Sequence, residues 1–331
     1  MMPLCISVEK KFAESVIKEL RKLGLLDDQY AITRTQSSVI IPVKATTPGE
    51  VLDLSYTRVE VTECSPPKRK TVESKVKMPA LDFVGNVVIL RENVLKHRSI
   101  DDVVRSVKQV YPRVRAIWVK EETVDTYRLP VLRLLWGDDT REILVKEHGL
   151  KMKVLLGEVY FNPRLAEEHY RVSQLVRDGE IVVDAFSGIG GFALQIALRK
   201  VSLVVANDLN PTAYELLVEN TLLNKSKLRG IIIPLNTDVV ELPNVLRHKS
   251  VDRLIADFPT KSTEYFEVYD TLLKPRGVLH LYLLSSRGCE EVRVKVSEIF
   301  KRWEVNTCRV VMEYSPRRNI YRCDLVKPKN I

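Results

Sequence analysis

The apolar residues in the second half of the chain fall into short runs that alternate with helical patterns. Five of these runs are predicted as buried parallel strands: 181–185, 203–206, 231–235, 253–256 and 278–284. The helical patterns before and between them cover 165–176, 192–198, 211–223 and 290–300. Such alternation predicts a doubly wound, mostly parallel α/β sheet that binds ligands at the carboxyl ends of its strands. Two final runs, 305–314 and 321–326, are predicted to form an antiparallel hairpin at one edge.

The first half of the chain contains both helical and strand-like apolar patterns. It predicts two smaller α+β domains. In the first of them, five apolar residues recur at helical spacing: Val8, Phe12, Val16, Leu20 and Leu23. Strands are predicted at 39–43 and 58–61. The second small domain is predicted to hold the following elements: a strand at 83–90, a helix at 100–110, a strand at 116–119, and a strand pair formed by 152–156 and 159–161.

A basic, proline-containing segment separates the two small domains. Pro66 and Pro67 precede Lys68, Arg69 and Lys70. Prolines keep a segment extended, and a basic run can lie on phosphates, although a solvated tether explains the same residues equally well. We therefore expect four parts along the chain: a domain at 1–64, a linker at 65–78, a domain at 79–157 and the α/β domain at 158–331.

Charge and composition narrow the classes of function. The 331 residues carry a formal charge of +9, and 45% of them are hydrophobic. An excess of basic over acidic residues favours polyanionic partners, although many basic proteins bind no nucleic acid. No apolar run reaches about 18 residues, so we expect no membrane-spanning helix. Charged residues also come too early in the chain for a signal peptide.

The cysteines and histidines give no metal-binding pattern. The five cysteines are scattered through the chain: Cys5, Cys64, Cys289, Cys308 and Cys323. None belongs to a C-x-x-C pair, so the sequence predicts neither a zinc site nor a disulfide framework. The five histidines are dispersed as well, and we expect no metal. This usage favours the reducing cytoplasm.

A glycine-rich turn follows the first predicted parallel strand. It begins at Asp184 and continues through Phe186, Gly188, Gly190 and Gly191. Glycines let a cofactor approach the backbone closely, and the amides of the following helix N-terminus favour negative or polar groups. The spacing D-x-F-x-G-x-G differs from the dinucleotide fingerprint G-x-G-x-x-G. It looks like motif I of the S-adenosylmethionine (AdoMet) methyltransferases, whereas the alternative is a plain strand–helix connection.

Acidic residues follow the next two predicted strands. Asp208 comes at the end of the second strand, where a carboxylate can accept hydrogen bonds from both ribose hydroxyls. The alternative for Asp208 is a helix-capping role before Asn210 and Pro211. Asp238 follows the third strand, where an acid can take the adenine amino group, although a structural role is nearly as well supported. The glycine turn, a ribose acid and an adenine acid, in this order, predict AdoMet binding.

The fourth strand ends in Asp257-Phe258-Pro259-Thr260. In amino-group methylases the matching loop reads Asn/Asp-Pro-Pro-aromatic, and its aromatic residue stacks on the base. Thr260 occupies the aromatic position here, which argues against methylation of an exocyclic amine. The loop suits a site where another residue removes the proton from the target atom.

Several motifs together resemble the archaeal–eukaryotic type tRNA guanine-37 N1-methyltransferases, a class I AdoMet-dependent family with wyosine-pathway relatives. The most specific motif is Gly157-Glu-Val-Tyr-Phe-Asn-Pro-Arg-Leu-Ala-Glu-Glu-His169. The others are Tyr127-Arg128, Leu135-Trp136-Gly137, Asp208-Leu209-Asn210-Pro211, Glu219-Asn220 and Asp257-x-Pro259. The resemblance covers the chain from about residue 80 to its end, and 1–64 fits the extra N-terminal domain that many members carry.

The resemblance implies a role for each matching residue. Glu168 would be the general base, in preference to its neighbour Glu167, and Arg128 would hold the charge that develops on guanine O6. The residues implied to bind AdoMet are Tyr160, Arg164, Asp184, Phe186, Gly188, Gly190, Asp208, Leu209, Asp238 and Asp257. Asp257 and Pro259 would also shape the loop that receives the base, and Lys68, Arg69 and Lys70 would contact RNA. Without this resemblance, the better-supported interpretation would be structural, with Glu168 as a surface acid of a helix and Arg128 as a salt-bridge partner.

The sequence therefore predicts a monomeric, cytoplasmic, AdoMet-dependent methyltransferase acting on N1 of guanosine 37 in tRNA. We expect contacts with the anticodon stem-loop and, through 1–64, with the tRNA elbow, and none with a membrane. The family usually has asparagine where this chain has Asp257, so a wyosine precursor at the same position is a second possible substrate. Three alternatives stay open: an aminocarboxypropyl transferase, which by its pattern lacks the acid matching Glu168; a non-catalytic tRNA-binding protein; and methylation of a protein or a small metabolite.

Overall fold

The computed structural model describes residues 3–44, 47–54, 57–67, 81–124 and 129–329. The chain divides into two compact units, Met1–Lys77 and Met78–Ile331. Four residues predicted to contact RNA or the target base lie outside the described residues: Lys68, Arg69, Lys70 and Arg128. Across the described parts of the chain, no helix has the length and apolar content needed to cross a bilayer.

The first unit is a small antiparallel sheet covered by one helix. The sheet has the order β2-β3-β1-β6, with β1 at Leu4–Glu9, β2 at Thr33–Arg34, β3 at Ser38–Val43 and β6 at Thr62–Glu63. Helix α1 spans Ala13–Lys22, and a separate hairpin joins β4 (Val51–Leu54) to β5 (Thr57–Glu60). The predicted helical stripe was wrong at Val8, which lies in β1. Ile6 and Val8 are buried and Ser7 between them is exposed, so the strand period governs this segment.

Two disulfide bonds correct the prediction of no disulfide framework. Cys5 is bonded to Cys64 with their Cα atoms 5.8 Å apart, and Cys308 is bonded to Cys323 with Cα atoms 4.1 Å apart. Strand pairing brings both pairs together, since Cys308 lies directly opposite Cys323 in a hairpin and Cys64 follows a strand paired with β1. Cysteine spacing along the chain carries no signal of either pairing. Cys289 is a free cysteine.

The second unit begins with a four-stranded sheet of order β10-β9-β8-β7. Its elements are β7 (Leu81–Val84), β8 (Val87–Arg91), η1 (Glu92–His97), α2 (Ile100–Val110), β9 (Ala116–Val124) and β10 (Leu129–Gly137). The single strand predicted at 83–90 was wrong, because the chain turns at Gly85, whose φ of 59° favours glycine. Residues on both sides of this turn form the antiparallel pair of β7 and β8. The helix predicted at 100–110 is confirmed as α2.

A two-stranded hairpin, β11 (Glu142–Glu147) with β12 (Leu150–Leu155), connects this sheet to the rest of the unit. The predicted pairing of 152–156 with 159–161 was wrong, since only the isolated bridge between Leu156 and Val159 forms. Two asparagines of helix α5 (Pro211–Asn224) hold β12 through its backbone. Asn220 accepts from Lys153 N at 2.6 Å, and Asn224 donates to Lys151 O at 2.7 Å. Asn220 of the Glu219-Asn220 motif is thus a structural clamp.

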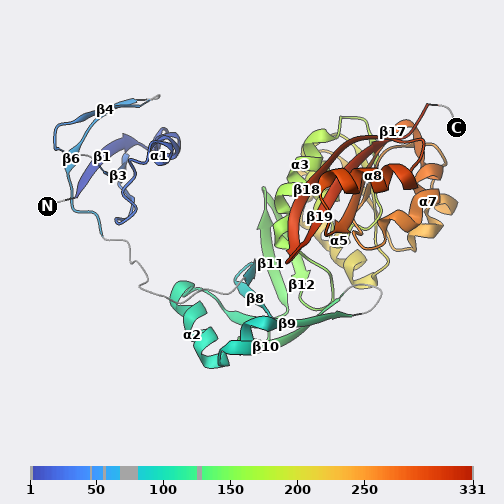
Figure 1. Ribbon diagram of the computed structural model, residues 1–331, viewed down its shortest axis with the longest axis horizontal. Helices are drawn as coiled ribbons and strands as arrows, with labels where there is room; N and C mark the ends of the chain where they lie inside the picture. The colour runs from blue at the N-terminus through green and yellow to red at the C-terminus, as the bar shows by residue number, and fades with distance from the viewer. Residues whose placement is uncertain (1–2, 45–46, 55–56, 68–80, 125–128, 330–331) are drawn as a thin grey trace. The chain divides into compact units, whose positions relative to one another are not determined.

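The remaining residues form a seven-stranded sheet of order β15-β14-β13-β16-β17-β19-β18 (Figure 1). Its strands are β13 (Ile181–Asp184), β14 (Leu203–Asn207), β15 (Ile231–Leu235), β16 (Val251–Ala256), β17 (Leu273–Ser285), β18 (Glu304–Ser315) and β19 (Arg318–Val326). The first five are parallel, whereas β19 runs antiparallel to β17 and pairs with β18 at the edge. The predicted fold class and its closing hairpin are confirmed.

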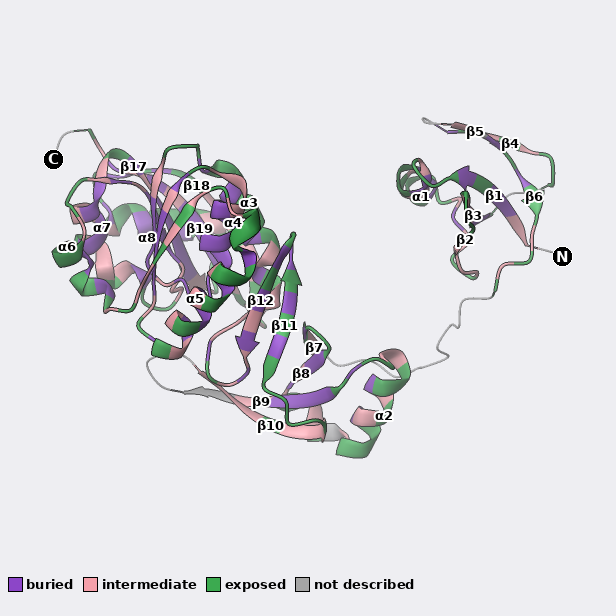
Figure 2. Ribbon diagram, turned by 180° about the vertical axis from the view of Figure 1, so that it is seen from behind, coloured by how far each residue is buried: buried purple, intermediate pink, exposed green. Residues whose placement is uncertain are grey.

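Helices cover both faces of this sheet. They are η2 (Pro163–Leu165), α3 (Ala166–Leu175), α4 (Gly191–Arg199), α5, η3 (Lys225–Lys227), η4 (Val239–Glu241), α6 (Leu242–Val245), η5 (Ser262–Tyr265), α7 (Phe266–Leu272) and α8 (Cys289–Ile299). Val183 and Leu254 face α6, α7 and α8, whereas Val182 and Ile255 face α3, α4 and α5. The strands between these layers are largely buried, and the outer sides of the helices are exposed (Figure 2).

Candidate active site

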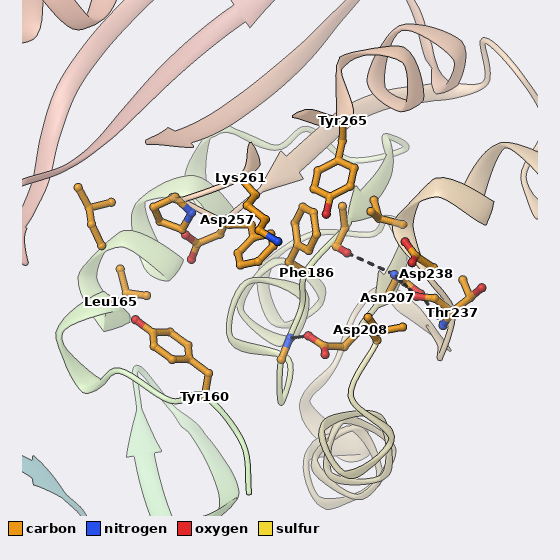
Figure 3. Close-up of a pocket in the computed structure, with 17 residues that line it drawn as sticks. Tyr160, Leu165, Phe186, Asn207, Asp208, Thr237, Asp238, Asp257, Lys261 and Tyr265 are labelled. Carbon is orange, nitrogen blue, oxygen red and sulfur yellow. Dashed lines mark hydrogen bonds between the residues drawn. The ribbon is translucent and has the colours of Figure 1, made fainter. Parts of the chain in front are cut away.

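A cavity of about 180 Å³ opens at the carboxyl ends of β13, β14 and β16. Its walls contain eight of the residues that the sequence predicts for cofactor or base binding: Tyr160, Phe186, Gly188, Asp208, Leu209, Asp238, Asp257 and Pro259. Tyr160 and Asp257 lie toward one end and Asp238 toward the other, with Phe186 and Asp208 between them (Figure 3). The strand ends and the segment before η2 therefore bring together residues that are separated by nearly 100 positions in the sequence.

The glycine turn forms one wall of the cavity because its backbone is left-handed. Gly188 has a φ of 52° and Gly190 a φ of 101°, a region that side chains disfavour. A Cβ atom on Gly190 would also lie 2.7 Å from Leu217 Cδ1. Gly190 caps the N-terminus of α4, so its conformation sets where that helix begins. Gly188 lines the cavity, whereas Gly190 acts behind it through the backbone.

Asp208 joins the end of β14 to the glycine turn. Its Oδ2 accepts a hydrogen bond from Gly188 N at 2.7 Å, and its Oδ1 accepts one from Asn210 N at 2.9 Å. Burial raises the pKa of Asp208, and the two backbone amides oppose that shift. The helix-capping alternative does not hold for α5, because Asn210 is its N-cap and accepts from Thr212 N. Each oxygen of Asp208 keeps acceptor capacity toward the cavity.

Asp238 and Asp184 have different surroundings. Asp238 lines the cavity and also caps η4, with Oδ1 accepting from Val240 N at 3.1 Å. Asp184 is fully buried and does not line the cavity. Neither of its oxygens completes a hydrogen bond within normal geometry, although the amides of Phe186 and Ala193 face it and lower its pKa. Burial and the nearby charges of Asp257 and Asp208 outweigh them and raise that pKa well above its usual value.

Aromatic side chains complete the wall next to Asp257. The ring centroid of Phe186 lies 5.1 Å from that of Phe258 and 5.5 Å from that of Tyr265. Phe258 and Tyr265 line the cavity, whereas Thr260, where the sequence comparison expects an aromatic residue, does not. Sequence reasoning missed Tyr265 because it lies in η5, beyond the motif that follows β16.

Glu168 is buried on α3 within a group of side chains from three strands and its own helix. Only 2% of its side chain is exposed, and it does not line the cavity. Oε1 accepts from Tyr282 Oη at 2.9 Å and from Arg322 Nη1 at 2.6 Å. Oε2 accepts from Arg171 Nη1 at 3.1 Å and from Arg309 Nη2 at 3.3 Å. We call these five residues the Glu168 cluster.

The register of β17, β19 and β18 builds this cluster. Tyr282 and Arg309 both lie directly opposite Arg322, on its two neighbouring strands. Burial and the charge of Glu168 raise the pKa of Tyr282 well above its usual value, so its hydroxyl stays protonated and donates. Burial alone would lower the pKa of Arg322, but its acidic neighbours raise it. The cluster therefore surrounds the carboxyl group of Glu168 with four hydrogen-bond donors.

A second row of polar side chains supports Arg322 two residue positions further along the same strands, on the same face of the sheet. Asp324 Oδ1 lies 2.9 Å from Arg322 Nε and 2.6 Å from His280 Nδ1, and Thr307 donates to Asp324 Oδ2 at 2.8 Å. Burial lowers the pKa of His280, which is therefore neutral. Burial would raise the pKa of Asp324, but the hydrogen bonds from His280 and Thr307 and the charge of Arg322 hold it far below its usual range.

The sequence carries a weak signal for these rows that the motif comparison did not use. Arg322 and Asp324 alternate with buried Cys323 and Leu325 in a strand that is otherwise largely apolar. Charged side chains two positions apart in a buried strand point to the same face and need partners there. Which partners they meet depends on a strand register that the sequence does not reveal.

Arg164 lies outside the cavity. Its Nε lies 2.7 Å from Asp82 Oδ1 on β7, and both residues line a second cavity of about 430 Å³ between the four-stranded and the seven-stranded sheet. Tyr160 lines both cavities. Arg164 therefore ties the two layers of this unit together next to the first cavity.

The residues around the first cavity fit a nucleoside-containing cation such as AdoMet. Three carboxylates face it, from Asp208, Asp238 and Asp257, against one lysine, Lys261. Carboxylates suit ribose hydroxyls, an adenine amino group and a positively charged amine or sulfonium. The aromatic rings of Phe186 and Tyr265 suit a flat heterocycle. Among the described residues, no group of three His, Cys, Asp or Glu side chains could hold a metal ion.

Two family models match this chain. The model of the TRM5/TYW2 methyltransferase domain matches residues 143–313, and that of the tRNA methyltransferase 5 N-terminal domain matches residues 5–51. A curated relative, tRNA (guanine(37)-N(1))-methyltransferase Trm5b of Pyrococcus abyssi, is 30% identical over 96% of this chain and 97% of its own. Another, tRNA 4-demethylwyosine(37)-methyltransferase Taw21 of Saccharolobus solfataricus, is 30% identical over 66% of this chain and 83% of its own.

Solved structures give the same result for the fold. The crystal structure of Trm5b from Pyrococcus abyssi has a TM-score of 0.66 and 27% identity, covering 98% of this chain and 100% of the other. The structure of aTrm5 in complex with tRNALeu has a TM-score of 0.65 and 26% identity, with the same coverage. Both comparisons confirm the methyltransferase fold predicted from the sequence.

Proposed function

Since the chain belongs to the TRM5/TYW2 methyltransferase family, we propose that it methylates N1 of guanosine 37 in tRNA, with AdoMet as the methyl donor. The observation that carries the proposal is the cavity at the strand ends, which gathers Asp208, Phe186 and Asp257 beside Tyr160. Relatives that span nearly the whole chain carry the name of this activity. AdoMet supplies an activated methyl group on a sulfonium, so the protein has to align the acceptor and remove its proton.

The proposed roles follow the position of each side chain. Asp208 binds the ribose, Asp238 the adenine amino group, and Phe186 the adenine face, while Tyr160 and Asp257 lie toward the reacting end. Guanine N1 carries a proton and is a poor nucleophile until a base removes it. Glu168 is the proposed base, and Arg128 is the proposed donor to O6, where negative charge develops. Pro259 shapes the loop that receives the base.

The tRNA is proposed to contact several parts of the chain. A basic net charge of +9 suits a polyanion, and a relative of similar fold has been solved with tRNALeu. We propose that the anticodon stem-loop approaches Arg128, that Lys68, Arg69 and Lys70 contact phosphates, and that residues 1–64 contact the elbow. The working form is proposed to be a cytoplasmic monomer.

A second substrate at the same tRNA position is favoured by Asp257. The family usually has asparagine there, and Asp257 lines the cavity next to the base-receiving loop. A carboxylate prefers a donor-rich or cationic edge of a base, which a wyosine precursor and guanine present differently. A relative named as a 4-demethylwyosine methyltransferase matches 66% of this chain. The retained Glu168 favours methyl transfer over aminocarboxypropyl transfer.

The test is incubation of the protein with AdoMet and unmodified tRNA, followed by mapping of modified nucleosides by mass spectrometry. The proposal expects 1-methylguanosine at position 37. A product heavier by an aminocarboxypropyl group would support the rival reaction, and the absence of any modified guanosine at position 37 would count decisively against the proposal. A parallel reaction on tRNA carrying the wyosine precursor tests the second substrate.

A further inference from the structure

The two oxygens of Glu168 have partners of opposite character. Oε1 is held by Tyr282 and Arg322, whose side chains are 0% and 3% exposed. Oε2 is held by Arg171 and Arg309, whose side chains are 45% and 36% exposed. The carboxylate therefore has an inner side fixed in the protein interior and an outer side bounded by arginines that reach the surface.

The inner side is rigid because Arg322 is itself held from behind. Asp324 Oδ2 accepts a hydrogen bond from Arg322 Nη2 at 3.1 Å, and Asp324 Oδ1 lies 2.9 Å from Arg322 Nε in the same ion pair. A planar guanidinium that binds one carboxylate with one edge and another with its remaining nitrogen has little freedom to rotate. Arg322 thus fixes the orientation of the Glu168 carboxyl plane.

The arginines on the outer side can exchange Glu168 for another anion. The contacts of Oε2 are longer, and Arg309 has a pKa lowered by burial and by the charge of Arg322. If Arg309 bound an RNA phosphate in place of Glu168, its charge would lie farther from the like charge of Arg322. Arg309 would still have an anionic partner. Arginine binds phosphate with the same fork that it presents to a carboxylate.

We propose that Arg322 is a positioning residue that anchors Oε1 of Glu168, and that Oε2 accepts the guanine N1 proton once RNA phosphates have drawn Arg309 and Arg171 away from it. This inference rests on the proposed function. As the N1–H bond breaks, its proton forms an O–H bond with Oε2. The electron pair left on N1 forms the bond to the methyl carbon, while the carbon–sulfur bond breaks and its electrons stay on sulfur.

The first test replaces Arg322. Arg322→Gln should lower kcat about 10- to 100-fold, because a misplaced base loses alignment, while the KM values for AdoMet and tRNA stay within about twofold. The acid limb of the kcat–pH profile should move to higher pH, because a carboxylate without its cation is protonated more readily. The titratable and charged groups facing Glu168 are Arg171 on its own helix, neutral Tyr282 on β17, Arg309 on β18 and Arg322 on β19. Arg322→Lys keeps the charge and should restore the pH profile in part.

The matched control is Arg253→Gln. Arg253 is also a buried arginine of this sheet, 6% exposed, and it pairs with Glu180 at 2.7 Å. It contacts His280 at 2.8 Å, so it reaches Arg322 only through His280 and Asp324 and does not touch Glu168. It should lower the thermal unfolding midpoint as Arg322→Gln does, yet leave the acid limb where it is in the wild type. An equal shift of the acid limb in both variants would overturn the positioning role.

The second test replaces Arg309, which reports on the outer oxygen. Arg309→Gln should raise the KM for tRNA and reduce the slope of log affinity against log salt by about one, while kcat stays at or above the wild-type value. A loss of kcat with a shifted acid limb, as expected for Arg322→Gln, would overturn the division between the two oxygens. Arg309 is partly exposed, so we expect Arg309→Gln to fold. This variant therefore tests the division between the two oxygens even if Arg322→Gln does not fold.

The outcomes separate this inference from the function on which it rests. Wild-type protein that forms no methylguanosine overturns both. Wild-type activity together with an Arg322→Gln variant that folds and keeps the wild-type kcat and acid limb overturns the inference alone.

Discussion

Arg322 on β19 donates a hydrogen bond of 2.6 Å to Oε1 of Glu168 on α3, 154 positions earlier in the chain. Both side chains are almost completely buried, so each needs charged partners in the interior, and each is one such partner of the other. This pair fixes the carboxyl group of the proposed base, on α3, against strand β19. The predictions below test this arrangement and the parts of the protein that surround it.

Replacing Glu168 with glutamine should abolish most of the turnover. We expect Glu168→Gln to lower kcat by about two to four decades, as for loss of a general base, with little change in AdoMet affinity. Glu167→Gln is the control, because the Glu167 side chain is 74% exposed and pairs only with His148 among the ion pairs of the described residues. Single-turnover kinetics measures both, and a Glu168→Gln variant that turns over at the wild-type rate would remove Glu168 from the mechanism.

Asp208 should matter for cofactor binding more than Asp238 does. Asp208→Asn replaces one acceptor with an amide donor that faces a backbone N–H, of Gly188 or of Asn210, so both the turn and the ribose site are disturbed. We expect AdoMet affinity to fall at least about tenfold, or about 1.4 kcal/mol. Asp238→Asn retains a cap acceptor and should have a smaller effect. Isothermal titration calorimetry compares them, and an equal loss in both variants would contradict the assigned roles.

Buried His280 should make the protein less stable in mild acid. Because its folded pKa is lowered, the unfolded chain binds a proton that the folded chain does not, once the pH falls below about 6.5. The stability that neutral His280 contributes is therefore present above that pH and is lost as the pH falls toward the folded pKa. Relative to His280→Gln, wild type should lose up to about 1.4 kcal/mol between pH 7.5 and 5.5. Urea unfolding measures this, and the exposed His248→Gln serves as control.

The disulfide of the first unit should stabilise that unit alone. Cys5 and Cys64 close a loop with a sequence separation of 59. In the chain-entropy model, losing such a crosslink costs about 4 kcal/mol. We expect Cys64→Ser to reduce hydrogen-exchange protection in β1 and β3 without changing AdoMet affinity, whereas Cys289→Ser should change neither. A titration that finds five free thiols in the non-reduced protein would rule this bond out.

The first unit is expected to bind tRNA without contributing to cofactor binding. Because Met1–Lys77 is a separate compact unit, deletion of residues 1–64 should leave the methyltransferase sheet folded. We expect tRNA affinity to fall about tenfold or more, with the AdoMet dissociation constant unchanged. Filter binding and calorimetry give the two values. If tRNA affinity is unchanged, the proposed elbow contact is wrong.

The cofactor cavity could be predicted from the sequence, whereas the surroundings of Glu168 could not. Asp208, Asp238 and Asp257 each follow an apolar strand, and parallel strands place their carboxyl ends at one edge of the sheet. That rule needs only local patterns. The partners of Glu168 depend instead on the register of β17, β19 and β18, which the sequence does not state. The two disulfides escaped prediction because they too depend on strand pairing, and the clamp made by Asn220 because it depends on how α5 packs against β12.

The most direct test of the central claim compares two tRNAs that differ only at position 37. The wild-type protein, AdoMet and unmodified tRNA with guanosine 37 should yield 1-methylguanosine at that position, identified by nuclease digestion and mass spectrometry. The same tRNA with adenosine 37 should stay unmodified. Methylation of both tRNAs at some other position, or of neither, would contradict the proposed reaction.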